Sequence, residues 1–343
     1  MLYRALRPFL FSLDPEQAHW LSLASLDRLY QLGLSCAVTS RMPSVPVRAM
    51  GLEFPNPVGL AAGLDKNGEH IASLGSLGFG FVEVGTITPR PQPGNPKPRL
   101  FRLPQAEAII NRMGFNNVGL DRAVRNIRNA GFRGVLGVNI GKNFDTPMER
   151  AVDDYIVCLQ KAYPVASFVT ANISSPNTRD LRTLQQAGEL EVLLGTLMHE
   201  RDALAGVHGR VVPLVVKIAP DLDDAAIEVI ADRVKAYRVD AVIATNTTSS
   251  REGVAHLAHG SEAGGLSGVP LRAKATAVIT RLRRALGESV CIIGVGGIFT
   301  AADAQEKLDA GANLVQIYTA LLYRGPQVVG EIVRGLTRAR RTR

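Results

Sequence analysis

An apolar run followed directly by a polar turn decides the fold of this chain: Phe168-Val169-Thr170-Ala171-Asn172-Ile173-Ser174-Ser175-Pro176-Asn177-Thr178. The first four residues are typical of a buried strand. The next seven contain two amides and three hydroxyls, with a proline that restricts the turn. Such groups at the end of a strand can hold a planar, hydrogen-bonding ligand without adding charge. We therefore expect a small ring to bind at this turn and Ser175 to take a proton from it.

Runs of the same kind recur along the chain, and there are eight in all. Most are separated by enough residues to form a helix. Continuously apolar, β-branched strands that alternate with helices are typical of a parallel sheet whose outer side is covered. Eight of them favour a closed (β/α)8 TIM barrel over an open doubly wound sheet, and no linker interrupts residues 58–343. The runs are residues 58–61, 81–84, 135–140, 168–173, 214–218, 241–245, 291–295 and 314–318.

In barrels of this kind the active-site residues lie where the strands end and the following loops begin. Every run in this chain ends in, or contains, polar or glycine residues at that point. One such strand end would mean little, because Asn, Gly and Thr are ordinary loop residues. Eight together indicate a ligand site at the mouth of the barrel. The positions are 62–67, 85–86, 139–143, 172–178, 217, 245–248, 296–297 and 318–319.

Lys217 lies within a strand of valine and isoleucine, where lysine is rarely found. An unpaired ammonium inside a barrel is costly, so we expect it to face an anionic or electron-rich ligand. A reduced flavin would suit it, because the N1–C2=O edge of the flavin ring becomes negative. The alternative is a lysine at the wet end of the strand, paired with Asp or Glu.

Glycines 294, 296 and 297 precede a helical stretch that begins near Thr300. This arrangement lets backbone amides approach a phosphate at the start of a helix. The third glycine of a dinucleotide fingerprint is missing, and the glycine spacing in residues 137–142 is one residue short of a P-loop. Because the loop after the seventh strand of a barrel often holds phosphate, we expect a phosphate group here.

Other classes of protein fit the sequence less well. Ser175 lies in no Gly-x-Ser-x-Gly elbow and no histidine lies at a strand end, which argues against a hydrolase triad. No cluster of histidines and carboxylates indicates a metal site, so we expect no metal. Cys36, Cys158 and Cys291 lie far apart, which favours a reducing compartment without disulfides. The formal charge of +8 is concentrated in the basic tail 334–343, and aromatic residues make up only 6%, so nucleic-acid binding is poorly supported.

The first 40 residues differ from the rest, and we assign them to a helical extension of a barrel domain spanning residues 41–343. Apolar residues at helical spacing predict an amphipathic helix at the start of the chain. Asp14 then predicts the start of a second helix, with Pro15 at its first position and Gln17 completing a capping box. This second helix is apolar on two faces. One face can pack on the barrel and the other can meet a membrane surface or an apolar ligand; a helical cap buried on its own domain is the alternative.

Motifs along essentially the whole chain resemble the quinone-dependent, or class 2, dihydroorotate dehydrogenases of bacterial type. Serine at position 175, where class 1 relatives carry cysteine, is what assigns the class. Together the motifs are highly specific. They are Asp14-Pro15-Glu16 with Ala18-His19, Asn56-Pro57-x-Gly59-Leu60-Ala61-Ala62-Gly63-Leu64-Asp65-Lys66, Gly85-Thr86-x-Thr88-Pro89-x-Pro91-Gln92-Pro93-Gly94-Asn95, Asn111-Arg112-Met113-Gly114-Phe115-Asn116-Asn117, residues 172–178, Lys217-Ile218-Ala219-Pro220-Asp221-Leu222, Asn246-Thr247-Thr248 and Gly265-Leu266-Ser267-Gly268.

The resemblance implies a (β/α)8 barrel that binds FMN, oxidises dihydroorotate to orotate in pyrimidine synthesis and passes the electrons to a quinone. Ser175 would be the base, with Thr178 on the way out for the proton. The flavin would be held by Ala62, Gly63, Lys66, Thr86, Asn139, Asn172, Lys217, Thr245, Gly268, Gly297, Tyr318 and Thr319. The pyrimidine would be held by Lys66, Asn111, Arg112, Asn172, Asn177, Asn246 and Thr247, with Met113, Gly114 and Phe115 as walls of its pocket.

The resemblance also implies a use for the N-terminal helices. In the family a quinone tunnel lies between them, and here His19, Arg102 and Tyr318 would be polar groups in its apolar bore. A peripheral monomer at the cytoplasmic face of the cell membrane would follow, since no apolar run is long enough to span a bilayer. Two other hypotheses stay open. One is a flavin barrel that uses fumarate or NAD, and the other is a non-flavin sugar-phosphate barrel or binding protein, which would leave Lys217 unexplained.

Overall fold

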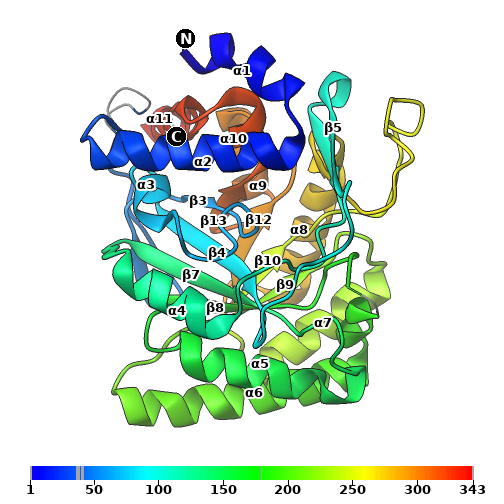
Figure 1. Ribbon diagram of the computed structural model, residues 1–343. Coiled ribbons are helices and arrows are strands. Elements are labelled where there is room, and N and C mark those ends of the chain that lie inside the picture. Colours follow the sequence, from blue (N-terminus) through cyan, green and yellow to red (C-terminus); the bar gives the residue numbers. More distant parts are fainter. Residues whose placement is uncertain (1, 36–38, 40–41, 179, 342–343) are drawn as a thin grey trace.

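The centre of the molecule is a closed barrel of parallel strands, in the order β3-β4-β7-β8-β9-β10-β12-β13 (Figure 1). The computed structural model describes residues 2–35, 39, 42–178 and 180–341. The barrel strands coincide with the apolar runs, so the predicted TIM barrel is confirmed. They are Val58–Leu60 (β3), Phe81–Ile87 (β4), Val135–Ile140 (β7), Phe168–Asn172 (β8), Leu214–Ile218 (β9), Ala241–Ala244 (β10), Cys291–Val295 (β12) and Leu314–Ile317 (β13).

Helices cover the outside of the barrel (Figure 1). Helix α4 illustrates why they form: it buries Leu120, Ala123, Val124 and Ile127, which recur every three or four residues on one face. Burying such a stripe stabilises the fold by roughly 25 cal/mol per Å² of apolar surface. The helices are Ile71–Gly75 (α3), Leu120–Asn129 (α4), Ala151–Ala162 (α5), Ala187–His208 (α6), Asp224–Ala236 (α7), Arg272–Leu286 (α8), Ala301–Asp309 (α9), Thr319–Arg324 (α10) and Gln327–Arg341 (α11).

A short hairpin closes the amino-terminal end of the barrel. It consists of β1 (Val47–Ala49) and β2 (Leu52–Phe54), which pair antiparallel around a tight turn. The ring of Phe54 packs edge-on against Phe81, with ring centroids 5.3 Å apart, and Phe81 packs in the same way on Phe168. The prolines around this segment indicate only a boundary, so the hairpin was not predicted. Its role follows from the open barrel end, which needs an apolar plug.

A three-stranded antiparallel sheet lies beside the mouth of the barrel. Its strands are Leu100–Leu103 (β5), Ala108–Asn111 (β6) and Gly265–Gly268 (β11), in the order β11-β6-β5. The register pairs Gly265 with Asn111 and Gly268 with Ala108, although more than 150 residues separate β6 from β11 in the chain. This sheet was not predicted either. It brings β6, which carries Asn111, beside β11, which carries Gly268, and both are expected site residues.

The N-terminal extension consists of α1 (Leu2–Ser12) and α2 (Pro15–Gln31), which lie together over one end of the barrel (Figure 1). The predicted helix start at Asp14 and Pro15 is confirmed, because the Asp14 carboxylate accepts hydrogen bonds from the amides of Glu16 and Gln17 and Pro15 is the first helical residue. The predicted capping box is not complete, because within the described residues the Gln17 side chain makes no reciprocal hydrogen bond to Asp14. Helix α2 buries Ala18 and Leu23 but leaves its other apolar face to solvent. The expected boundary at residues 40 and 41 lies outside the described residues.

Several large apolar side chains of the extension are exposed. Leu6 and Phe9 on α1 and Trp20 on α2 are exposed, Trp20 by 70%. Exposed apolar side chains that gather on one element mark an interaction surface more often than scattered ones do. Within the described residues, no helix is long and apolar enough to cross a membrane.

Candidate functional site

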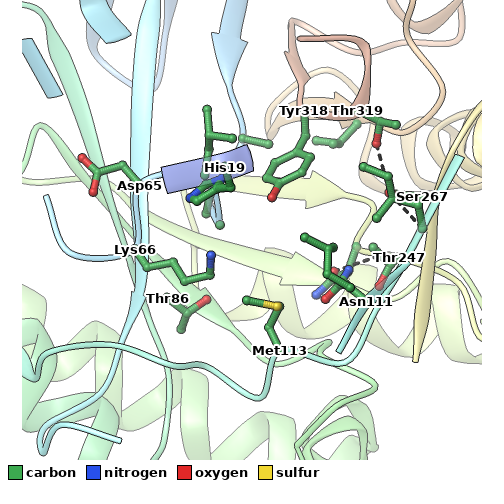
Figure 2. A pocket seen from close by; sticks show the side chains of 18 of the residues that line it. His19, Asp65, Lys66, Thr86, Asn111, Met113, Thr247, Ser267, Tyr318 and Thr319 are labelled. Carbon is green, nitrogen blue, oxygen red and sulfur yellow. Dashed lines mark hydrogen bonds between the residues drawn. The ribbon is translucent and has the colours of Figure 1, made fainter. Parts of the chain in front are cut away.

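A cavity of about 840 Å³ opens at the carboxyl ends of the barrel strands. Figure 2 shows side chains from distant parts of the chain pointing into it, with Lys66, Tyr318 and Met113 around one space while Asp65 turns away. Most residues expected to bind the flavin or the pyrimidine line this cavity. They are Ala62, Gly63, Lys66, Thr86, Asn111, Met113, Gly114, Phe115, Asn172, Ser175, Asn177, Lys217, Thr245, Asn246, Thr247, Gly268, Gly297, Tyr318 and Thr319.

Three expected residues lie outside the lining. The side chain of Arg112 is directed elsewhere: its Nη1 donates to Glu262 at 2.8 Å, and its guanidinium lies over the ring of Phe101. Asn139 is completely buried inside the barrel. Thr178 is buried behind the turn, and its carbonyl accepts from the following 3₁₀ turn. These positions leave Arg112 the least direct of the expected pyrimidine ligands.

The turn after β8 holds its polar side chains in defined places. The hydroxyl of Tyr155 on α5 donates to the carbonyl of Asn172 at 2.7 Å and anchors the end of the strand. The Ser175 Oγ accepts from the amide of Asn177 at 3.2 Å, which leaves the serine hydroxyl proton free to point toward the cavity. In the described part of the chain no hydrogen bond joins Ser175 to Thr178, so the Thr178 relay stays a prediction.

Two lysines, the buried Lys217 and the partly exposed Lys66, give the cavity its positive charge. Burial lowers the pKa of Lys66 to about 8, against the opposing attraction of Glu16. Burial also lowers the pKa of Lys217, and the charge of Glu83 works in the other direction. Among the described residues, none forms a hydrogen bond or salt bridge with the Lys217 ammonium. Lys217 is therefore not the solvated, ion-paired lysine of the alternative hypothesis, and its ammonium can face a ligand.

Glycines with positive φ line the side of the cavity formed by β11 and β12. Gly268, Gly296 and Gly297 have φ of +101°, +119° and +70°. A Cβ at Gly297 would lie 2.6 Å from the backbone of Arg272, so only glycine fits there. The following helix α9 begins after Thr300, as predicted, and it starts with a complete capping box between Thr300 and Asp303. This loop can bring backbone amides close to a phosphate.

A second cavity of about 380 Å³ lies between the N-terminal helices and the barrel. Its walls are mostly apolar, and His19 and Leu64 line both cavities, so the two meet there. Burial and the neighbouring Lys66 and His70 charges lower the pKa of His19 to about 3, which keeps its ring neutral. The guanidinium of Arg102 lines the second cavity and donates to two carbonyls of the extension. Tyr318 lines only the larger cavity, where burial raises its pKa to about 12.

Two polar groups inside the barrel were not predicted from the sequence. Glu83 on β4 and Gln316 on β13 are completely buried and hydrogen-bonded to one another. Each lies within an apolar run, as Lys217 does. The criterion that singled out Lys217, a polar residue inside an apolar strand, would have found both.

The described residues contain no group of three or more His, Cys, Asp or Glu side chains that could hold a metal ion. Cys158 and Cys291 are free and buried, and Cys36 lies outside the described residues. Burial raises the pKa of both thiols. Buried, protonated thiols of this kind behave as small apolar side chains.

A TIM barrel with buried lysines, amides and a serine at the ends of its strands defines a barrel enzyme with a site for a planar, anionic ligand. The family model described as dihydroorotate dehydrogenase matches residues 44–339. A relative from Nitrosomonas eutropha, named dihydroorotate dehydrogenase (quinone), is 60% identical over 332 residues, which are 97% of this chain and 96% of the relative. A relative of the same name from Burkholderia multivorans is 57% identical over 339 residues, 99% of this chain and 98% of the relative.

Solved structures agree. The crystal structure of DHODH from Eimeria tenella in complex with ferulenol has a TM-score of 0.88 and 38% sequence identity, and the match covers 96% of this chain and 92% of that one. A ligand-free form of the same enzyme has a TM-score of 0.86 at 39% identity, with 96% of each chain covered. The chain therefore belongs to the dihydroorotate dehydrogenase family and is an oxidoreductase of a flavin-dependent family.

The residues at the site fit a flavin. The cavity is within the range of about 300–1,000 Å³ that is typical of small-molecule sites. The ammonium of Lys217 has no hydrogen-bond partner in the described part of the chain, which suits the electron-rich edge of a flavin ring. Gly296 and Gly297 line the cavity, where their backbone amides can approach a phosphate.

Proposed function

We propose that this protein oxidises dihydroorotate to orotate in pyrimidine synthesis and transfers the two electrons through FMN to a quinone. The observation that carries the proposal is the junction of two unlike cavities. A polar cavity with Ser175, Lys66 and Lys217 meets an apolar cavity under the N-terminal helices at His19. A small polar substrate and a lipid-soluble acceptor need two such environments within reach of one redox group.

FMN would be held by Ala62, Gly63, Lys66, Thr86, Asn172, Lys217, Thr245, Gly268, Gly297, Tyr318 and Thr319, with Asn139 supporting it from inside the barrel. Bound FMN supplies the hydride acceptor and passes electrons on singly or in pairs. Lys217 places a positive charge in a water-poor cavity, where it is worth more than in water. Backbone amides at Gly268, Gly296 and Gly297 would bind the phosphate.

The pyrimidine would be held by amides and hydroxyls at the other strand ends. Asn111, Asn172, Asn177, Asn246 and Thr247 offer donors and acceptors to a urea-like ring edge, and Met113, Gly114 and Phe115 wall the pocket. The Asn177 Nδ2 donates to the Asn111 carbonyl at 3.1 Å, while its Oδ1 is buried without a partner in the described structure. That acceptor suits a ring N–H. Lys66, with its pKa of about 8, is mostly protonated at neutral pH and can pair with the substrate carboxylate.

Ser175 would remove the proton from the ring carbon next to the carbonyl, while the hydride leaves from the neighbouring carbon. A serine hydroxyl is a weak base in water, so it needs a buried position, and only 5% of Ser175 is exposed. Its proton would leave by way of Thr178.

The quinone would enter the smaller cavity between α1 and α2. Its walls are apolar, and His19 and Arg102 offer polar contacts for the quinone oxygens, with Tyr318 at the flavin side. Leu6 and Phe9, which also line this cavity, and Trp20 are exposed apolar residues that would meet the cytoplasmic face of the cell membrane, where the protein would act as a peripheral monomer.

The test is anaerobic reduction of the purified yellow protein by dihydroorotate, followed by reoxidation with quinone, fumarate or NAD. The flavin absorbance should bleach on mixing and return fastest with quinone. Return with fumarate or NAD alone would assign the acceptor to another class. The proposal as a whole would be contradicted if the protein were colourless, or if its flavin stayed oxidised after dihydroorotate was added.

A further inference from the structure

Arg182 lies in the 3₁₀ turn Leu181–Gln185, which follows the polar turn after β8. Its side chain is mostly covered, with 26% exposed, and it lies outside the lining of the larger cavity. The guanidinium donates to acceptors on three different loops. Nε donates to the carbonyl of Ser174 at 3.3 Å, Nη2 to the carbonyl of Thr247 at 3.1 Å and Nη1 to the carboxylate of Asp221 at 3.1 Å. One planar group thus joins the loops that follow β8, β9 and β10.

The two carbonyls belong to the main chain beside the expected reaction site. The Ser174 carbonyl is part of the peptide group whose nitrogen is that of Ser175, the expected base. Thr247 lines the cavity and is an expected pyrimidine ligand. Because a peptide group is planar and rigid, a donor that holds its oxygen also fixes the path of the chain beside it. Arg182 therefore links the backbone of the base to the backbone of a residue that would hold the ring.

Arg182 is itself held in place. Leu181 and Leu184 of its 3₁₀ turn are buried, and the Oε1 of Gln185 accepts from the amide of Ala219, which follows β9, at 2.9 Å. The guanidinium adds to this rigidity, because its donors lie in one plane and cannot turn independently. The two loop carbonyls are therefore held at a fixed spacing and not merely tethered.

Asp221 supplies the negative charge opposite Arg182. Its carboxylate also accepts from the hydroxyl of Thr248 and from the amide of Ser249 at 2.9 Å. Burial raises the pKa of Asp221, but hydrogen bonds from Thr248, Ser249 and a neighbouring lysine outweigh it and lower the pKa to about 2. The carboxylate is therefore charged at neutral pH. Thr248 and Ser249 directly follow Thr247, so Asp221 and Arg182 hold the same stretch of the loop after β10.

A second contact joins the loops after β8 and β10, but it involves side chains alone. The Nδ2 of Asn246 donates to the Oγ of Ser174 at 3.0 Å. Rotation of either side chain breaks that bond, whereas Arg182 holds the main-chain oxygens themselves. Hydrogen bonds from a charged donor are also stronger than those between neutral groups. The spacing of the two loops therefore depends more on Arg182 than on Asn246.

We propose that Arg182 is a positioning residue that fixes Ser175 relative to the ring held at the loop after β10. The roles of Ser175 and of the pyrimidine rest on the proposed function. Proton removal requires the serine oxygen within hydrogen-bond reach of the proton on the ring carbon, and a misplacement of about 1 Å can slow a reaction about 100-fold. Binding of the product ring makes no such demand on the serine. Arg182 therefore contributes more to the rate of the reaction than to affinity for the ring.

The purified flavin-loaded protein allows both quantities to be measured. Anaerobic stopped-flow absorbance gives the rate of flavin reduction by dihydroorotate, and the change in the flavin spectrum on titration gives the affinity for orotate. Arg182→Met keeps most of the apolar stem but removes every donor. Flavin reduction should slow on the order of 100-fold, while orotate should bind less than about tenfold more weakly. Equal losses in rate and affinity would show a general loosening of the site and overturn the proposal, as would an unchanged rate.

Arg182→Lys keeps the charge opposite Asp221 and decides the question if Arg182→Met does not fold. An ammonium is a compact charge on a flexible stem, so it cannot hold both carbonyls in the fixed geometry of a guanidinium. Flavin reduction should therefore remain more than about tenfold slower than in the unaltered protein. A rate equal to that of the unaltered protein would show that only the charge is required and would overturn the positioning role.

Lys274→Met is the matched control. Lys274 donates to the same Asp221 carboxylate at 3.1 Å, but in the described structure it donates to neither loop carbonyl. Its loss should leave flavin reduction and orotate affinity within about twofold of the original values. A loss as large as that of Arg182→Met would assign the effect to the charge balance at Asp221 and contradict the proposal.

Two further outcomes separate this proposal from its neighbours. FMN content should be the same in all three variants, and loss of FMN from Arg182→Met would show that Arg182 supports the flavin site instead. Unaltered protein whose flavin dihydroorotate does not reduce would contradict the proposed function itself. Equal rates of flavin reduction in unaltered protein and Arg182→Met would contradict only this inference.

Discussion

The two cavities meet at His19 but are built in opposite ways. In the larger one, polar side chains come from the ends of barrel strands and hold one another, as Asn172 and Asn246 do. In the smaller one, two helices laid on the barrel enclose apolar space, and the polar groups bind backbone carbonyls: Arg102 those of Leu10 and Leu13. A polar group in the apolar cavity therefore has two roles: it holds the helices in place through backbone carbonyls, and it offers its remaining donors to a ligand.

Ser175→Ala should have the largest effect of the variants considered, and it should affect only the reaction in the larger cavity, the reduction of the flavin by dihydroorotate. Reduction of the flavin by dihydroorotate should slow by about 10²–10⁴-fold, because the positioned base is lost. Stopped-flow absorbance under anaerobic conditions measures this rate. FMN content and reoxidation by quinone should stay as they were. Ser174→Ala, which removes the adjacent buried hydroxyl, serves as the control and should slow flavin reduction much less. If the two variants slowed flavin reduction equally, Ser175 would not be the base.

Glu16→Gln tests how much the ion pair between Glu16 on α2 and Arg99 next to β5 contributes to the free energy of unfolding. Arg99, with 8% of its side chain exposed, makes two hydrogen bonds to the Glu16 carboxylate and also donates to the carbonyls of Pro93 and Asn95. Leaving this guanidinium without its counter-charge should lower the free energy of unfolding by about 3 kcal/mol. Urea denaturation measures the change. Lys97→Met removes an exposed partner of the same carboxylate and should cost less than about 1 kcal/mol.

The neutral ring of His19 should make stability depend on pH at the junction of the cavities. Its folded-state pKa of about 3 lies below the ordinary value of 6.5. Below pH 6.5 His19 is therefore protonated in the unfolded chain but stays neutral in the folded chain. The free energy of unfolding falls as the pH is lowered from about 6.5 toward 3. The slope is up to about 1.4 kcal/mol per pH unit. Between pH 6.5 and 5, His19→Gln should lose up to about 2 kcal/mol less than the original protein in urea unfolding. Parallel pH curves for the two proteins would contradict this.

Arg102→Met should have the smallest effect and should stay within the apolar cavity. Loss of the guanidinium loosens the turn between the helices and removes a polar contact for quinone, so the KM for quinone should rise roughly tenfold. Flavin reduction by dihydroorotate should not change. Arg7→Met is a matched control, because Arg7 also donates to a carbonyl, that of Tyr323, but does not line the cavity. A slower reductive half-reaction in Arg102→Met would show that the two cavities are coupled.

The barrel and most of the candidate site could be predicted because they follow from local patterns. Each apolar run forms a strand. Because all strands of a parallel barrel end at the same face, the residues after each run lie at the mouth of the barrel. Lys217 could be singled out because a charge inside an apolar strand is rare. Arg112 could not be placed in the same way. It follows Asn111, which lines the cavity, but at the end of β6 successive side chains point to opposite sides.

By itself the sequence determined the eight strands, the start of α2 at Asp14 and the polar residues at the strand ends, since these depend on neighbours a few positions away. Only the tertiary structure decided the hairpin plug, the pairing of β6 with β11 and the buried hydrogen bond between Glu83 and Gln316. Those features join residues that are distant in the chain, and the direction of an amide depends on partners supplied by other strands. Hydrogen-bond direction is a property of the assembled barrel, and no single strand contains it.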